Sequence, residues 1–200
     1  MTANLYLTCF LSGLLFCSCS SDKKNRNADA LFNEGEYTRA IQVYDQQLNK
    51  NPDDYMTQYN RARAYEELGQ HKKALGEYKE ISKEHPEFFP AKMGEARYYF
   101  NQGDYETAAY TLENGIKKGD KDENAFFLYA RANHKAGKTK KALNAYDKAI
   151  EKNRDFGLAY LYRGALKIYL ERKREGCSDL KIAASLEVDE AQPAIEEYCQ

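Results

Sequence analysis

The chain of 200 residues contains no tryptophan, only four prolines and only 12 glycines, and these scarcities favour one class of fold. Glycine and proline supply many of the tight turns that an all-β domain needs, so a β-sandwich is disfavoured. Tyrosine is abundant instead, with 17 copies. This profile predicts a helical protein with a large surface relative to its core.

An excess of either charge is also missing, because 30 Lys and Arg residues face 31 Asp and Glu residues. A protein that binds nucleic acid normally carries a basic excess, with which it neutralises phosphates and releases their counterions. The charge balance therefore argues against a nucleic-acid partner.

No apolar run is long enough to cross a membrane, because the longest, residues 5–16, falls short of the roughly 20 residues that a spanning helix needs. A short apolar run at the N-terminus, followed by small residues, predicts a secretion signal. Ser18 and Cys19 then resemble the lipobox of a bacterial lipoprotein signal, in which a small residue precedes the acylated cysteine. Cys17 is a poorer candidate because the bulky Phe16 precedes it.

The resemblance implies a signal peptide over residues 1–18, acylation (palmitate) at Cys19 and a lipidated tether over 19–27. Two other interpretations of the N-terminus remain open. The first residues could be a wrongly assigned start or an ordinary buried helix. A metal-binding Cys-x-Cys pair would need further ligands, and the three histidines stand in no spaced motif with it; they are His71, His85 and His134.

Residues recur with a period of 34 along almost the whole chain. One column is glycine, two are small residues and one is tyrosine or leucine. The columns are Gly35, Gly69, Gly103 and Gly137; Ala40, Ala74, Ala108 and Ala142; Ala28, Ala62, Ala96, Ala130 and Gly164; and Tyr44, Tyr78, Leu112, Tyr146 and Leu180. Each unit is predicted to be a hairpin of two helices, such as Tyr55–Leu68 followed by His71–Glu84, with glycine in a left-handed cap between them. The small columns allow the two helices to approach closely.

This pattern, clearest in "RARAYEELGQHKKALGEYKEISKEHP", resembles the tetratricopeptide repeat family. The resemblance implies an all-α, right-handed solenoid over residues 28–200, with five units followed by a capping helix over 191–199. Glu171 stands where the fifth unit should carry its glycine. The units are 21–54, 55–88, 89–122, 123–156 and 157–190.

Two cysteines remain in the solenoid, Cys177 near the start of a second helix and Cys199 at the end of the capping helix. The capping helix should run antiparallel to that second helix, which would bring the two side chains together. Because export places the chain in an oxidising compartment, we expect a Cys177–Cys199 disulfide. Two separate buried thiols are the alternative.

In this family the first helices line a concave groove, so the resemblance implies a partner-binding set on them. Three arginines at steps of 34 residues could bind carboxylates or a peptide backbone; solvated side chains, and packing of the aromatic column between repeats, are the alternatives. The predicted groove residues are Tyr59, Arg63, Met93, Arg97, Phe100, Phe127, Arg131 and His134. The positions of the family's carboxylate clamp hold other residue types, so capture of a chaperone tail by that mechanism is not supported.

The sequence shows no phosphate-binding loop, nucleophile elbow or metal-ligand set, so we expect no enzyme activity, cofactor, metal or small-molecule substrate. The expected function is a membrane-anchored scaffold or adaptor that binds a peptide or protein segment in the cell envelope. Ser20 after Cys19 resembles an outer-membrane sorting signal, and the periplasmic face is preferred to the cell surface. The alternative is a permanent structural subunit of a barrel- or pilus-assembly machine, docked through its convex face.

Overall fold

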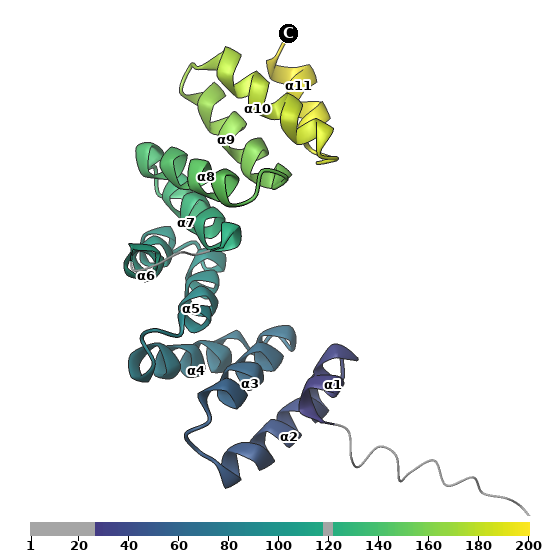
Figure 1. Cartoon of the computed structure of the whole chain (residues 1–200), viewed down its shortest axis with the longest axis vertical. Helices are drawn as coiled ribbons and strands as arrows, with labels where there is room; N and C mark the ends of the chain where they lie inside the picture. The colour runs from purple at the N-terminus through teal and green to yellow at the C-terminus, as the bar shows by residue number, and fades with distance from the viewer. Residues whose placement is uncertain (1–26, 118–121) are drawn as a thin grey trace, which may run out of the picture.

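The computed structural model describes residues 27–117 and 122–200, and in these ranges the chain forms eleven helices and no strands (Figure 1). Five hairpins follow one another and a single helix ends the chain. The helices are α1 (Ala28–Asn33) and α2 (Tyr37–Lys50); α3 (Tyr55–Glu67) and α4 (His71–Glu84); α5 (Phe89–Asn101) and α6 (Tyr105–Lys117); α7 (Glu123–Lys135) and α8 (Thr139–Lys152); α9 (Gly157–Tyr169) and α10 (Lys173–Ser185); and α11 (Ala191–Tyr198).

The predicted all-α solenoid is confirmed. The second helix of each hairpin packs on the first helix of the next, and the hairpins stack from α1 at one end to α11 at the other (Figure 1). Helices α3 and α4 match the predicted helices to within one residue. The predicted signal peptide, the lipidation site at Cys19 and most of the tether lie outside the described residues.

A residue in the left-handed backbone conformation follows the first helix of every hairpin. The four glycines of the periodic column have φ between 70° and 80°. After α3, the N–H of Gly69 donates to the carbonyl of Glu66 and the N–H of Gln70 to that of Tyr65, which is the pattern of a Schellman cap. Glu171 adopts the same conformation, with φ of 62°, although its Cβ makes that backbone costly. The turn geometry is therefore kept where the glycine is not.

The tyrosine and leucine column fills the interior between hairpins. All five of its side chains are at most 2% exposed, and the residues are Tyr44, Tyr78, Leu112, Tyr146 and Leu180. The alanines of both small columns are equally buried beside them. The apolar core is thus a continuous row along the solenoid rather than one central cluster, as expected for stacked repeats.

The fifth hairpin has glycine in both small columns, Gly164 on α9 and Gly176 on α10. A Cβ built on Gly176 would lie 2.6 Å from the carbonyl oxygen of Gly164 and 2.5 Å from Cγ1 of Ile168. The two helices therefore touch through their backbones. No other residue type fits this contact without moving one helix.

A buried ion cluster lies beside this contact. Asp179 of α10 is 3% exposed and accepts hydrogen bonds from Nε and Nη2 of Arg163 at 2.8 and 2.7 Å and from Nζ of Lys167 at 2.7 Å. Arg163 also binds the exposed Asp147 of α8 at 2.7 Å. The same arrangement occurs three units earlier, where Arg61 of α3 binds Asp45 and Glu77.

Helix α11 caps the last hairpin by packing on α10, and it ends at Tyr198, one residue before the predicted end. The sulfur atoms of Cys177 and Cys199 are bonded in the structure, with the two Cα atoms 5.7 Å apart. Nζ of Lys173 also donates to the backbone carbonyl of Gln200 at 2.8 Å. The chain end is therefore tied to the beginning of α10.

Candidate binding face

The eight predicted groove residues lie on three successive first helices, α3, α5 and α7. Contacts join each of these helices to the unit before it. We call the surface that α3, α5, α7 and α9 present at these positions the first-helix face. Each arginine of the face reaches back to the residue 31 positions earlier: Arg63 to Phe32, Arg97 to Glu66 and Arg131 to Phe100.

Arg97 is already paired within the chain. Its Nη2 lies 3.2 Å from Oε2 of Glu66, which also accepts a hydrogen bond from the hydroxyl of Tyr78 at 2.8 Å. Burial raises the pKa of the Glu66 carboxyl, but the hydrogen bond and charge of Arg97 outweigh it, so the pKa lies below its ordinary value. Glu66 is thus ionised at neutral pH, and Arg97 holds the second and third units together.

Arg63 and Arg131 stack on aromatic rings instead of pairing with acids. The guanidinium carbon of Arg63 lies 4.6 Å from the ring centroid of Phe32. That of Arg131 lies 4.7 Å from the centroid of Phe100 and 4.9 Å from that of Tyr162, so two rings from neighbouring helices hold it. Stacking fixes the guanidinium plane without using its N–H donors.

The aromatic members of the set pack against rings of their own unit and of the next one. Tyr59 packs edge-on against Phe88, with ring centroids 5.1 Å apart. Phe127 packs against Phe156 at 4.9 Å and against Tyr162 at 5.7 Å. These contacts leave the rings half-buried. The packed rings thus form part of the layer beneath the first-helix face.

The two remaining predicted residues are also partly enclosed. Met93 packs against the buried cluster that contains Phe89 and Leu112. Nδ1 of His134 lies 3.3 Å from the hydroxyl oxygen of Tyr146. Burial, with the nearby charges of Lys135 and Arg131, lowers the pKa of His134 below its ordinary value. His134 is therefore neutral at pH 7.

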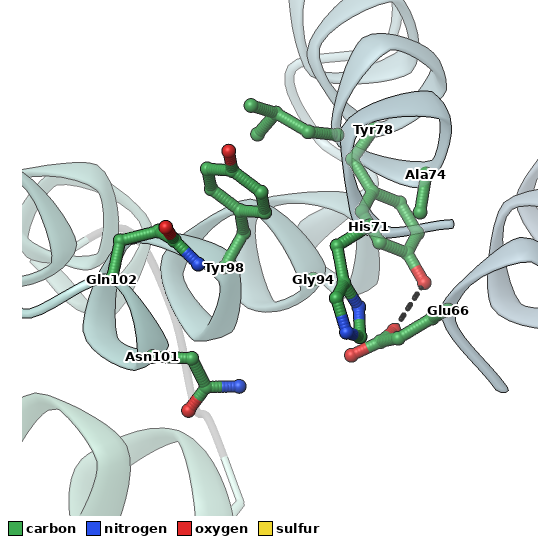
Figure 2. Close-up of a pocket in the computed structure, with 9 residues that line it drawn as sticks. Glu66, His71, Ala74, Tyr78, Gly94, Tyr98, Asn101 and Gln102 are labelled. Atoms are coloured by element: carbon green, nitrogen blue, oxygen red, sulfur yellow. Dashed lines mark hydrogen bonds between the residues drawn. The ribbon is translucent and has the colours of Figure 1, made fainter. Parts of the chain in front are cut away.

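A pocket of about 240 Å³ opens beside Gly94, between the second hairpin and α5 (Figure 2). A Cβ on Gly94 would lie 2.5 Å from the ring of Tyr78, whereas the equivalent positions in other units hold Asn60, Leu128 and Tyr162. Figure 2 shows His71 and Glu66 side by side at its wall, with the Tyr78 hydroxyl directed at Glu66. Glu66 is already bonded to Tyr78 and Arg97, so its carboxylate serves the contact between the second and third units. We therefore interpret the pocket as a gap in the packing between these units.

A group of exposed apolar side chains on the first-helix face lies on α9 and was not among the predicted site residues. Leu158 is 39% exposed and Tyr169 is 77% exposed. With Leu161 and Ala165 they follow helical spacings of three and four residues along one side of α9. We call these four residues the α9 strip. The 34-residue register places Leu158 at the position of Asn124 and Tyr169 at that of Lys135, but it does not show that the two apolar side chains stay exposed.

Over residues 27–117 and 122–200 no group of His, Cys, Asp and Glu side chains has the arrangement of a metal site. In the same ranges no helix combines the length and the apolar character that a bilayer span requires.

Comparison with family models relates two overlapping segments to known repeats. Residues 31–98 match the tetratricopeptide repeat model, and residues 91–149 match a model described as anaphase-promoting complex, cyclosome, subunit 3. The tetratricopeptide repeat and J domain-containing co-chaperone DNJ1 of Cryptococcus neoformans is 30% identical over 124 residues, which are 62% of this chain and 23% of that protein. The chain therefore spans about a quarter of that relative's length.

Solved structures with the same architecture are more distant in sequence. MamA from Desulfovibrio magneticus RS-1 superposes with a TM-score of 0.73 at 17% identity, covering 80% of this chain and 90% of that one. YrrB, described as a TPR protein with an unusual peptide-binding site, superposes with a TM-score of 0.71 at 18% identity, covering 84% of this chain and 88% of that one. These similarities support the fold.

Proposed function

Because the chain is a tetratricopeptide repeat protein, we propose that it is an interaction scaffold that binds a peptide or protein segment on its first-helix face. The observation that carries this proposal is the α9 strip. Leu158 and Tyr169 are large apolar side chains on one fully formed helix, and they are 39% and 77% exposed. Exposed apolar side chains grouped on one surface are typical of binding sites for other proteins.

The family of the chain is consistent with this role. The core of a solenoid runs along its whole length, so the helices present a long surface to solvent. Such a surface suits the binding of extended segments. YrrB, which shares the fold, is described as having a peptide-binding site, and DNJ1 is named a co-chaperone. Both descriptions concern those proteins, and we extend only the general role of protein binding to this chain.

The binding face can be tested by photo-crosslinking in cells with a benzophenone amino acid at Tyr169. Tyr110 on α6 is the matched control, because it is an equally exposed tyrosine, at 70%, on a second helix. We expect a discrete protein adduct from position 169 and none from position 110. Adducts at 110 alone would contradict the proposal and favour a permanent subunit docked through the second helices.

We also propose that acylation of Cys19 anchors the scaffold to the cell envelope, on the outer membrane and facing the periplasm. The support is the apolar run of residues 5–16 followed by Ser18 and Cys19. Cells fed an alkyne-bearing fatty acid should label the wild-type chain and the Cys17→Ser variant, while the Cys19→Ser variant should lose the label. Equal labelling of both variants would exclude Cys19 as the anchor.

A further inference from the structure

Arg131 combines a fixed side chain with unused hydrogen-bonding capacity. Its guanidinium lies between the rings of Phe100 and Tyr162, at 4.7 and 4.9 Å, with the ring of Phe127 at 5.8 Å. In the described part of the chain no oxygen accepts a hydrogen bond from it. A guanidinium carries five N–H donors in a planar fork that matches a carboxylate. Arg131 is thus oriented for an acceptor that the chain itself does not supply.

The other two arginines of the face differ from Arg131 in the acidic side chains near them. Arg97 is paired with Glu66. Arg63 is stacked like Arg131, on the ring of Phe32, but its own helix α3 also carries Glu66 and Glu67 near its end. An incoming carboxylate would meet repulsion near Arg63 that is absent near Arg131. The two stacked arginines therefore form a natural comparison.

The surroundings of Arg131 are positive or neutral. Helix α7 ends with His134 and Lys135, and the acid at its other end, Glu123, accepts a hydrogen bond from Asn153. Helix α9 contains no acid at all. The cations of α9, Arg163 and Lys167, are bound to acids of α8 and α10. Of these two helices, α7 is therefore the one that carries positive charge not bound to an acid within the residues that the structure describes.

The α9 strip lies next to this charge. Helices α7 and α9 contact each other, and Tyr162, which stacks on Arg131, belongs to α9. The strip presents Leu158, Ala165 and Tyr169 to solvent, with Leu161 half-buried among them. One continuous surface therefore offers a carboxylate-binding fork and, one helix away, a row of apolar side chains.

We propose that this α7–α9 surface binds a partner segment in which an Asp or Glu side chain lies beside apolar side chains. Arg131 binds the carboxylate through two N–H donors, and the apolar side chains cover the α9 strip. A side-chain carboxylate is favoured over a chain end, because rings of α5 and α9 flank Arg131 and the face continues on both sides of it. This inference rests on the proposed scaffold function and specifies the chemistry of its partner.

The test measures fluorescence anisotropy of three short labelled peptides, all with blocked termini, on the purified solenoid. One contains leucine and glutamate, one replaces glutamate with lysine, and one replaces leucine with serine. The leucine–glutamate peptide should bind at least about tenfold more tightly than either of the others. Equal affinities for all three would overturn the inference. The leucine–glutamate peptide is also measured with a free C-terminus, and binding of that form alone would likewise overturn the inference.

Variants then separate charge from packing. Arg131→Gln should weaken binding of the leucine–glutamate peptide by about tenfold, and Arg131→Lys should restore it only in part because a lysine cannot form the bidentate pair. Arg63→Gln, the matched stacked arginine, should change the affinity by less than about twofold. Tyr169→Ser should weaken the binding of the same peptide and leave the far-ultraviolet circular dichroism spectrum of the solenoid unchanged. Equal effects of Arg63→Gln and Arg131→Gln would contradict the assignment.

Crosslinking distinguishes this inference from the scaffold function. If position 169 still captures a partner in cells with the Arg131→Gln variant at the wild-type level, the scaffold function stands and the role of Arg131 is wrong. If position 169 captures nothing in the wild-type chain, the scaffold function itself is wrong.

Discussion

Replacing Asp179 with alanine is expected to lower the free energy of unfolding by about 4 kcal/mol. Asp179 is 3% exposed and binds both Arg163 and Lys167, whose side chains are themselves only 14% and 13% exposed. Removing one member of a buried ion cluster leaves the others desolvated without a partner, and this costs more than the pair contributes when intact. Urea denaturation followed by circular dichroism measures the change.

The control for Asp179 is Asp147, the second acid bound to Arg163. Its side chain is 60% exposed, so water can replace it, and Asp147→Ala should cost less than about 1 kcal/mol. If the two alanine variants are equally stable, the buried position of Asp179 does not decide the energetics of this cluster.

The second large effect is expected for Gly176→Ala, which should destabilise the solenoid by about 3 kcal/mol. The new Cβ would lie 2.6 Å from the backbone oxygen of Gly164 and 3.0 Å from the backbone nitrogen of Ile168. Backbone atoms cannot rotate away as a side chain can, so α9 and α10 must separate. The separation would also disturb the hydrogen bonds between Asp179 and Arg163.

Gly76→Ala is the same chemical change on α4 and should have the opposite sign. Nothing lies within 4 Å of a Cβ at Gly76, and alanine favours the helix over glycine by about 1 kcal/mol. Measured together in urea, the two variants should therefore differ by about 4 kcal/mol. A destabilisation of similar size at both positions would mean that helix geometry at large, and not the α9–α10 contact, is sensitive.

The sequence allowed the architecture to be predicted because the repeat positions carry local physical requirements. Gly69 predicts a left-handed turn, Ala74 a close helix contact and Tyr78 a buried ring, and each recurs with the same period. Agreement of several requirements in each unit makes the hairpin the one structure that satisfies them all. The capping helix followed from the same logic, since the last hairpin would otherwise expose its apolar side.

The candidate site could be predicted only in outline. The positions of Arg63, Arg97 and Arg131 on the first helices follow from the register. Which neighbour each arginine meets depends on the residue 31 positions earlier, and that position is not periodic: it is phenylalanine, glutamate and phenylalanine in turn. Whether an arginine is paired or available is therefore decided by contacts between units, which a column-by-column comparison does not show.

The α9 strip was missed for a related reason. The predicted site favoured charged and aromatic columns that repeat, whereas the columns of Leu158 and Tyr169 contain both apolar and polar residues. An exposed apolar residue cannot be told from a core residue until the neighbouring hairpin is in place. Exposure is a property of the stacked array and not of one unit.

The bond between Cys177 and Cys199 also sets how the molecule would respond to a pulling force. Tension applied between residue 27 and residue 200 would pass along the backbone to Cys177 and then cross directly to Cys199 through the two sulfur atoms. Helix α11 and the part of α10 from Ser178 onward lie inside the bridged loop and would carry no load. The added length would consequently come from the residues before Cys177, while the residues inside the loop would stay joined to the chain end and add no length to the stretched molecule.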